Sequence, residues 1–459
     1  MSQFVADGAA AVFIERREQL VEYFETGCKP EVDWRIGTEY EKVAVRREDA
    51  RAVPFSGPRG IERLLSELAS RYGWTPLLED GRTVALRGER ASITLEPGGQ
   101  LELSGEVCDS VHCAQAEFAR HIEEIVSVGD ELRIAFLGLG MQPVSRIDEI
   151  EMVPKKRYGI MRPYMDKVGT LGGRMMAQTA TVQVNMDFSS EADAMMKMRL
   201  GMGIAPLLNA MLANSPLCDG DLNGFVSFRG HVWTDTDNAR SGFLPFVFEE
   251  RGGGFERYAD YALDVPMYFI VRDGEWFDMT SMTFRRFLDT GHRGHRATMT
   301  DWDAHLTTLF PETRMKRYIE LRSVDSQPPE LMLAVPALAK GIFYDRDCMS
   351  AAWDLVKQWT FAERIELYAT AHRRGLQTRV GRVSFRDLAV ELLTIARTGL
   401  ERQAVKNSRG DDESVYLERL TELNLRGLCP ADVVIEKWNG EWNQQVGRMI
   451  DGSSYRVAA

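Results

Sequence analysis

The chain has 459 residues, of which 44% are hydrophobic and 27% are charged, the proportions of a folded globular protein. It carries 56 Lys and Arg against 68 Asp and Glu, so its net charge is −12. This charge argues against binding to nucleic acid or to an anionic membrane, and neither is expected as a partner. Small soluble substrates fit the charge better.

Neither the start of the chain nor its cysteines indicate export. The first residues, MSQFVADGAA, lack the basic segment of a signal peptide, and no window approaches the roughly 20 apolar residues of a membrane span. The six cysteines form no CxxC pair, so a zinc site or a disulfide framework is not expected. We therefore predict a cytoplasmic protein in which Cys108 and Cys113 are unpaired thiols.

Hydrophobic periodicity predicts several helices in the first half of the chain. Apolar residues at helical spacing predict an opening helix over 11–26 that ends at Gly27. Further helical patterns cover 61–72, 113–133 and 191–214. In the last of these, Pro206 is expected to kink or divide the helix.

Strand-like patterns alternate with these helices. Polar and apolar residues alternate over 35–45, 92–105, 179–188 and 317–324. Asp273-Gly274 lies between two shorter alternating runs, which is typical of a hairpin. From about residue 332 the periodicity is helical. We predict an α+β fold in which residues 1–331 form a catalytic body and 332–459 form a helical C-terminal region packed on it, unless both belong to one domain.

The predicted strands carry acidic and amide side chains in register. Residues two apart in a strand share a face, so Glu39 points with Glu41, and Gln183 lies on the polar side of its own strand. Pro-Gly-Gly separates Glu96 from Glu102, and a tight turn or bulge there would hold both carboxylates at one end of a hairpin. These residues are candidates for one shared polar face.

The strand over 317–324 adds a further carboxylate. Its polar side carries Glu320 and Arg322, while Ile319 faces the core. If the strands form one sheet, five carboxylates converge beside Gln183, and their repulsion requires a positive partner. All the donors are oxygens, so a hard divalent cation such as Mg²⁺, bridging the phosphates of a nucleotide, fits best. The alternative is that the glutamates lie on a solvated sheet face.

Two arginines are candidates for binding an anionic ligand. Arginine grips a carboxylate or a phosphate with two parallel hydrogen bonds, and Arg229 and Arg322 stand in apolar, strand-like segments. The basic cluster 155–157 is instead expected to be exposed to solvent. Tyr268 could line a pocket or belong to the core. No P-loop motif occurs, so any ATP would be held by metal and sheet.

Long motifs give the chain a resemblance to one enzyme family. They are GTEYEK, LEPGGQLELSG, VGTLG, TATVQVNMDFSSEAD, ANSPLCDG, RGHVWTDTDNARSGFLPFVF, YALDVPMYFIVRDG and YIELRSVDSQPP. With these motifs the chain resembles the plant and proteobacterial type of glutamate–cysteine ligase from about residue 33 to about residue 447. Motifs of this length are far more specific than a short pattern.

The resemblance implies a fold and an activity. The fold would be similar to that of glutamine synthetase, with a central antiparallel sheet forming one wall of the active site. The enzyme would use ATP, with Mg²⁺ or Mn²⁺, to join L-glutamate to L-cysteine through a γ-glutamyl phosphate. The product would be γ-glutamylcysteine, from the first step of glutathione biosynthesis.

The resemblance also implies roles for particular residues. Arg229 would grip the glutamate carboxylate, Arg322 would contact the phosphoryl group and Tyr268 would form part of the cysteine pocket. Glu41 and Glu320 would act in catalysis, and a glycine-bearing loop over 251–254 is a candidate lid. The implied metal-site residues are Glu39, Glu41, Glu96, Glu102, Gln183 and Glu320.

The sequence departs from the plant members of this family where their regulatory disulfides form. Gln115, Met279 and Met332 stand at the corresponding positions, so the plant redox switch and its linked dimerisation are not implied. A monomer or a homodimer and feedback by glutathione stay open. Two other hypotheses remain: a γ-glutamyl ligase for another amine or another thiol pathway, and a non-catalytic sensor of glutamate or nucleotide on the same fold.

Overall fold

The computed structural model describes residues 12–249 and 253–457. Within these ranges the centre is a nine-stranded antiparallel sheet with the order β14-β15-β7-β1-β5-β4-β3-β2, in which β6 also pairs with β1. Its strands are β1 (Ile36–Arg46), β2 (Thr75–Glu79), β3 (Arg82–Arg87), β4 (Ser92–Leu95), β5 (Leu101–Ser104), β6 (Ile134–Leu137), β7 (Val182–Met186), β14 (Thr313–Met315) and β15 (Ile319–Leu321). The central antiparallel sheet with flanking helices confirms the predicted α+β class.

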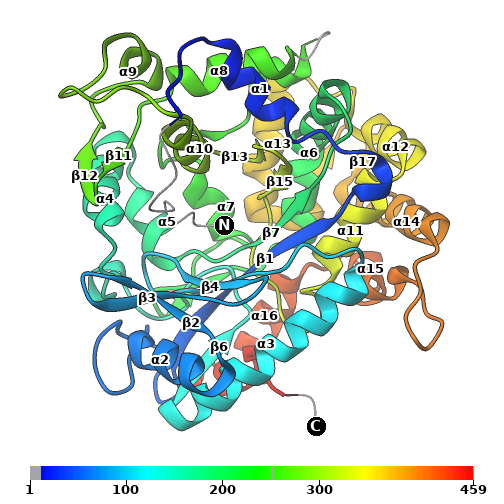
Figure 1. Ribbon diagram of the computed structural model, residues 1–459. Helices are drawn as coiled ribbons and strands as arrows, with labels where there is room; N and C mark the ends of the chain where they lie inside the picture. Colours follow the sequence, from blue (N-terminus) through cyan, green and yellow to red (C-terminus); the bar gives the residue numbers. More distant parts are fainter. Residues whose placement is uncertain (1–11, 250–252, 458–459) are drawn as a thin grey trace.

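Helices cover this sheet (Figure 1). The first half of the chain contributes α1 (Glu18–Glu25), α2 (Ile61–Tyr72), α3 (Val111–Leu132), α4 (Lys156–Val168), α5 (Gly172–Gln178), α6 (Glu191–Met211) and α7 (Phe228–Trp233). The second half contributes α8 (Gly254–Asp264), α9 (Phe284–Thr290), α10 (Met299–Thr307), α11 (Ala334–Phe343), α12 (Arg346–Val356), α13 (Phe361–Arg374), α14 (Phe385–Gln403), α15 (Glu418–Leu425), α16 (Pro430–Asn439) and α17 (Val446–Ser453).

Short two-stranded pairs complete the architecture. They are β8 (Leu217–Cys218) with β9 (Asp221–Leu222), β10 (Ser241–Gly242) with β13 (Phe310–Pro311), β11 (Phe269–Arg272) with β12 (Glu275–Asp278), and β16 (Arg379–Val380) with β17 (Val383–Ser384). The hairpin predicted at Asp273-Gly274 joins β11 to β12, and both of its turn residues have positive φ. This backbone is what a two-residue hairpin turn demands.

The opening helix is shorter than its pattern predicts. α1 begins at Glu18, so the apolar residues before it do not extend the helix. Gly27 does follow the helix, but it does not have the positive φ of a C-terminal glycine cap. It is required for close packing instead, because a Cβ at Gly27 would lie 2.5 Å from the carbonyl oxygen of Arg317.

Helix α6 passes through Pro206 without being divided, so of the two predicted outcomes, a kink or a division, division does not occur. A proline inside a helix removes one backbone hydrogen bond, a cost that packing has to offset. Nearly every residue of α6 from Ala194 onward is buried, and the helix packs against α12 and α13. Ser190 caps its start by accepting a hydrogen bond from the backbone N–H of Asp193.

Of the helices after residue 332, α11, α12, α14 and α15 lie toward the right-hand side of the view in Figure 1, α16 lies low near its centre, and α13 stands in its upper half. α11 packs directly on β7 and β1, and α17 packs on β6. A buried ion pair between Lys340 on α11 and Glu413 joins this region internally, with 2.5 Å between the charged atoms. The division at residue 332 stays a prediction, and the contacts of α11 make that helix part of the wall of the central sheet.

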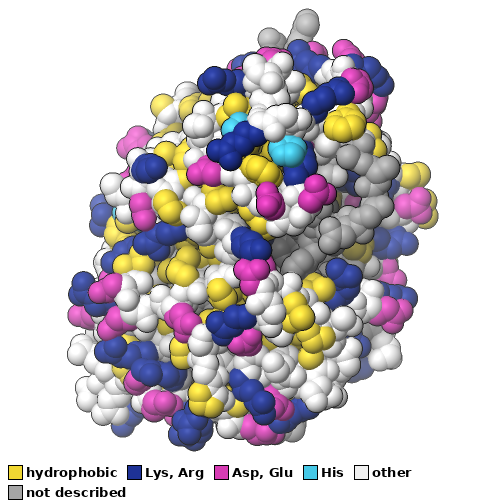
Figure 2. Space-filling model, turned by 60° about the vertical axis from the view of Figure 1, so that its left-hand side comes forward, with side chains coloured by type: hydrophobic (Ala, Val, Ile, Leu, Met, Phe, Trp, Pro, Cys, Tyr) yellow, Lys and Arg dark blue, Asp and Glu magenta, His cyan; other side chains and the backbone are white. Residues whose placement is uncertain are grey.

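The surface mixes both signs of charge. On the face in Figure 2, basic and acidic side chains are interspersed, with apolar side chains in small groups between them. Among the described residues, no helix is both long and apolar enough to cross a membrane. The proposed lid over 251–254 cannot be described as a whole, because residues 250–252 lie outside the described ranges.

One cysteine prediction is wrong. Cys108 and Cys113 form a disulfide, with their Cα atoms 5.7 Å apart, a normal separation for such a bridge. The pairing depends on tertiary structure. Cys108 forms a backbone β-bridge with Ile36 at the start of β1, and Cys113 lies in the first turn of α3. The disulfide thus ties the start of α3 to the end of the central strand.

The turn between β4 and β5 gives a test of this architecture. A Cβ at Gly98 would collide with the carbonyl oxygen of Ala177, so Gly98→Ala should destabilise the protein by about 1–3 kcal/mol in urea unfolding. Gly159→Ala on α4 is the control, because no atom lies within 4 Å of its added Cβ, and its stability should stay equal or rise. Equal stability of the two variants would show that this close approach does not constrain the turn.

Candidate active site

Direct strand pairing brings the predicted polar residues to one face of the sheet. Residues that pair across an antiparallel ladder point to the same side. The pairs across the sheet are Glu320 with Asn185, Gln183 with Glu39, and Glu41 with Glu102. The shared polar face predicted from the strand pattern is therefore present, and we call it the carboxylate face.

One end of the carboxylate face is a cluster of three glutamates. One carboxylate oxygen from each of Glu41, Glu96 and Glu102 lies within 4.8 Å of the others. Glu96 joins the cluster from the β4–β5 turn, where Gly99 has a φ of +85° and donates its backbone N–H to the carbonyl of Glu96. The turn does hold both carboxylates at the end of a hairpin, as the Pro-Gly-Gly segment suggested.

The electrostatics of this cluster call for a cation. Burial and the neighbouring carboxylates Glu96 and Glu102 raise the pKa of Glu41 well above its usual value. Burial and the charge of Glu39 likewise raise the pKa of Glu102. Carboxylate oxygens are the preferred ligands of Mg²⁺ and Mn²⁺, and binding a divalent cation would remove the repulsion. The donor set of Glu41, Glu96 and Glu102 therefore fits a divalent cation.

Arginines neutralise the other end of the face. Glu320 is fully buried and lies 2.6 Å from the guanidinium of Arg314 and 2.9 Å from that of Arg322. Burial opposes ionisation of Glu320, but the two arginines outweigh it and lower its pKa. Glu320 is thus a permanently charged anchor that holds Arg322 at the edge of the face.

Amide side chains connect the two ends. Gln183 donates to one oxygen of Glu39 at 3.0 Å, and Asn185 donates to the other at 3.2 Å. The amide oxygen of Gln183 accepts a hydrogen bond from Arg322. Charged and polar groups therefore form a continuous hydrogen-bonded row from Arg322 to Glu39.

Arg229 stands beside Arg322 at the mouth of a narrow pocket. It lies on helix α7, not in a strand as its apolar context suggested, because Ser227 caps a single helical turn there. Its Nη2 donates to the backbone carbonyl of Arg322 at 3.0 Å, and its Nη1 lies 4.0 Å from Asp325. The pocket is lined by Arg229, Trp233, Phe310, Pro311, Glu312, Arg322 and Tyr368, and the open space among them, including solvent at the mouth, is about 220 Å³. Two cations at one wall make it a receptor for an anion.

Tyr268 belongs to a different cluster. Its ring lies 3.8 Å from the guanidinium of Arg240 and edge-on to Tyr164 at 5.5 Å, and only 1% of the residue is exposed. Arg240 in turn pairs with Asp237 at 2.5 Å. The structure therefore does not bring Tyr268 to the carboxylate face, and places it among residues of the segment WTDTDNAR.

The basic cluster at 155–157 is not fully exposed, contrary to the prediction. Lys155 is buried and donates to the carbonyl of Leu95 at 2.8 Å, while Arg157 is half-buried against Tyr158. Burial and the charge of Arg157 lower the pKa of Lys155 to about 7, although Glu96 partly opposes them. Lys156 alone is exposed. Lys155 and Arg157 therefore lie near Glu96 and Glu102, a position that the sequence does not indicate.

Two other residues of the site were missed from the sequence. Arg314 pairs with Glu320 across the β14–β15 hairpin, and the short connection between them is the signal that could have revealed it. Asp325 is fully buried and accepts hydrogen bonds from Ser215 and Ser227. In the sequence, the only indication of a role for Asp325 is its position in the motif RSVDSQPP, because loop residues show no hydrophobic periodicity.

Curated relatives of the chain share most of its length. Glutamate–cysteine ligase, chloroplastic, of Brassica juncea is 44% identical over 434 residues, which cover 94% of this chain and 82% of the relative. Glutamate–cysteine ligase B, chloroplastic, of Oryza sativa subsp. japonica is 43% identical over 434 residues, with 94% and 85% covered. These chloroplastic relatives contradict the predicted cytoplasmic location, because neither cysteine spacing nor net charge reports on the compartment.

Two further comparisons cover nearly the whole chain. A solved structure of glutamate–cysteine ligase from Francisella tularensis in complex with AMP superposes with a TM-score of 0.49 at 14% identity, covering 93% of this chain and 90% of the other. The model of glutamate-cysteine ligase family 2 (GCS2) matches residues 35–452. The chain belongs to glutamate–cysteine ligase family 2.

Proposed function

We propose that this ligase uses ATP to join the side-chain carboxylate of L-glutamate to the amine of L-cysteine, giving γ-glutamylcysteine for glutathione biosynthesis. Membership of the family supports this activity. The single observation that carries the proposal is the carboxylate face, in which clustered carboxylates at one end meet Arg322 and Arg229 at the other. Such a face suits a reaction that brings two anions together.

The proposed chemistry has two steps. An oxygen of the glutamate side-chain carboxylate attacks the γ-phosphorus of ATP, a new P–O bond forms, and ADP leaves with the electrons of the broken bond. The amine of cysteine then attacks the carbonyl carbon of the γ-glutamyl phosphate, loses a proton, and expels phosphate. Because Glu320 fixes Arg322 by an ion pair, its donors are already oriented when charge develops on the phosphoryl group.

Metal ligands are assigned from the carboxylate face. Glu41, Glu96 and Glu102 would hold one divalent cation, Mg²⁺ or Mn²⁺, and Glu39, Gln183 and Glu320 are the further proposed ligands along the row. A divalent cation bound there supplies charge neutralisation for the phosphates of ATP. Glu320 also keeps Arg322 in place, because its carboxylate forms ion pairs with both Arg314 and Arg322.

Arg229 is proposed to bind the glutamate substrate. Its guanidinium forms one wall of the pocket beside Arg322, and a carboxylate in that pocket would meet two parallel donors. Tyr268 is proposed to contribute to the cysteine pocket through the cluster it forms with Arg240. Its burial means that this contribution would come from shaping the pocket wall.

ADP release coupled to product mass tests the activity. The purified protein is incubated with ATP, Mg²⁺ and glutamate, with and without cysteine. We expect cysteine-dependent ADP release and one γ-glutamylcysteine per ADP. ADP release that needs a different amine would contradict cysteine as the acceptor, and absence of turnover with every amine would favour the sensor hypothesis.

Substitution of Arg229 tests the glutamate site. Arg229→Lys keeps the positive charge but loses the two parallel donors of the guanidinium. The KM for glutamate should therefore rise about tenfold or more, with a smaller change in kcat. Arg409→Lys is the control, because the side chain of Arg409 is 84% exposed and lies outside every strand of the carboxylate face. An unchanged KM for glutamate in Arg229→Lys would remove this arginine from the glutamate site.

Substitution of Glu41 tests the cation site. Without metal, Glu41→Gln should raise the unfolding free energy by roughly 1 kcal/mol or more at neutral pH, because it removes one repelling buried carboxylate. Added Mg²⁺ should stabilise the wild type and not this variant. Thermal unfolding in EDTA and in Mg²⁺ measures both effects, with the exposed Glu48→Gln as control. A less stable Glu41→Gln in EDTA would mean that the carboxylates do not repel.

A further inference from the structure

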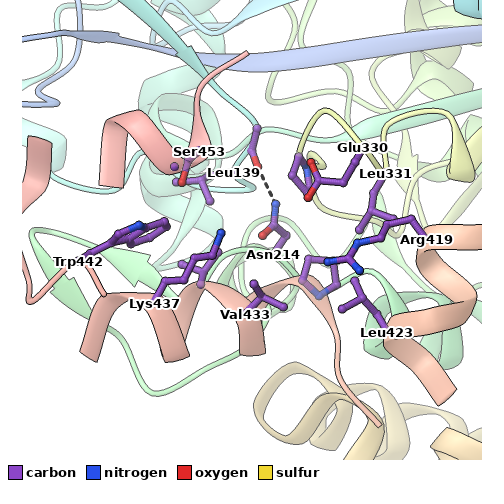
Figure 3. A pocket seen from close by; sticks show the side chains of 15 residues that line it. Leu139, Asn214, Glu330, Leu331, Arg419, Leu423, Val433, Lys437, Trp442 and Ser453 are labelled. Carbon is purple, nitrogen blue, oxygen red and sulfur yellow. Dashed lines mark hydrogen bonds between the residues drawn. The ribbon is translucent and has the colours of Figure 1, made fainter. Parts of the chain in front are cut away.

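A pocket separate from the carboxylate face lies among the C-terminal helices (Figure 3). α15, α16 and α17 form one side of it, and the segments that follow β6, α6 and β15 form the other. The open space among its lining residues, including solvent at the mouth, is about 440 Å³. None of its lining residues belongs to the carboxylate face or to the pocket beside Arg229.

The wall of this pocket contains a buried acceptor without a donor. Asn214 is 1% exposed, and its side-chain nitrogen donates to the carbonyls of Gly138 at 2.7 Å and Ser326 at 2.8 Å. These two bonds fix the orientation of the amide, so the other atom is the oxygen. Among the described residues, Oδ1 of Asn214 accepts no hydrogen bond. A buried acceptor left in this state destabilises the protein, and a donor on a ligand would relieve this cost.

A cation that is available to pair with a ligand lies on the opposite wall of the pocket. Within the described ranges, the side-chain ammonium of Lys437 makes no hydrogen bond or ion pair, and its Nζ lies 5.7 Å from the ring centre of Trp442. In Figure 3 the ends of Lys437 and Asn214 both point toward the middle of the pocket, between Trp442 and Arg419. Arg419 is already paired with Glu422 at 2.8 Å. The pocket therefore offers one unshared positive charge beside an aromatic ring.

The remaining walls limit what can bind. Leu139, Leu331, Leu423 and Val433 line the pocket, and Glu330 adds a negative charge at its rim. Apolar walls and a rim carboxylate disfavour an anion with several charges. We infer that the pocket is a second small-molecule site, which takes a small monocarboxylate with an N–H group near its carboxylate. Lys437 pairs with the carboxylate and Asn214 accepts from the N–H.

Asn214 also links this pocket to Arg229, the residue proposed to bind glutamate. The backbone N–H of Asn214 donates to Asp325 at 2.8 Å, and the other oxygen of Asp325 lies 4.0 Å from Arg229. A ligand bound to the Asn214 side chain is therefore connected to Arg229 through two contacts, from Asn214 to Asp325 and from Asp325 to Arg229. We assign the site an effector role, in which its occupant changes the affinity for glutamate. This second part rests on the proposed role of Arg229, whereas binding itself does not.

Direct binding tests the site without any assay of activity. N-acetylglycine is the probe, because it carries one carboxylate and one amide N–H on a small frame. Saturation-transfer NMR with the full-length protein and saturating glutamate should detect its binding. N-acetylglycinamide, which lacks the charge, and N-acetylsarcosine, which lacks the N–H, should each bind about tenfold more weakly. Equal signals from all three compounds would overturn the inference, and so would no signal from N-acetylglycine.

Two variants locate the binding. Lys437→Gln should weaken N-acetylglycine binding about tenfold, and Val433→Phe should block it by filling space from α16. Lys167→Gln, at an exposed lysine of α4, is the matched control and should bind normally. Circular dichroism verifies that each variant is folded. Binding that survives both pocket variants would place the probe elsewhere and overturn the assignment.

Kinetics test the effector role separately. N-acetylglycine should shift the KM for glutamate at least twofold in the wild type and in Lys167→Gln, and leave it unchanged in Lys437→Gln. A shift that persists in Lys437→Gln would show competition at the glutamate site, and would overturn the effector role. Normal binding with no shift in the wild type would overturn it too.

Discussion

The structure depends on an electrostatic imbalance across one face of a sheet. Direct strand pairing packs Glu39, Glu41, Glu102 and Glu320 into a buried row, and within the described part of the chain its ion pairs with arginine are made by Glu320, at one end. At that end Glu320 keeps its charge, and at the other the carboxylates hold one another's pKa values high. The protein thus keeps several carboxylates close together in a buried position, and a bound cation or a proton would relieve their repulsion.

The surrounding architecture holds this arrangement rigid. The disulfide at Cys108 fixes the end of β1, and α11 packs against β1 and β7 from the C-terminal region. Asp325 is held by three hydrogen-bond donors and lies 4.0 Å from Nη1 of Arg229. A preorganised site of this kind needs little rearrangement when charge develops during phosphoryl transfer. The C-terminal helices therefore support the active site as well as forming the second pocket.

Strand parity made much of the site predictable, because side chains alternate with a fixed period of two. This rule placed Glu39 with Glu41 on one face, and the Pro-Gly-Gly turn placed Glu96 near Glu102. Contacts made only by tertiary folding were not predictable. Burial of Lys155 depends on the segment before α4 lying against the β4–β5 turn, and the helix at Arg229 is too short to show periodicity. The Cys108–Cys113 disulfide likewise follows from the meeting of a strand edge and a helix start.

The central claim is that the carboxylate face activates glutamate as an acyl phosphate. Transfer of ¹⁸O tests it most directly: glutamate labelled in its side-chain carboxylate is turned over with ATP and cysteine, and the released phosphate is analysed by mass. Attack of the carboxylate on the γ-phosphorus leaves one substrate oxygen in the phosphate, so the account predicts one ¹⁸O in each phosphate released. Unlabelled phosphate from turnover that yields the dipeptide would contradict the account, because the carboxylate would then not have been phosphorylated.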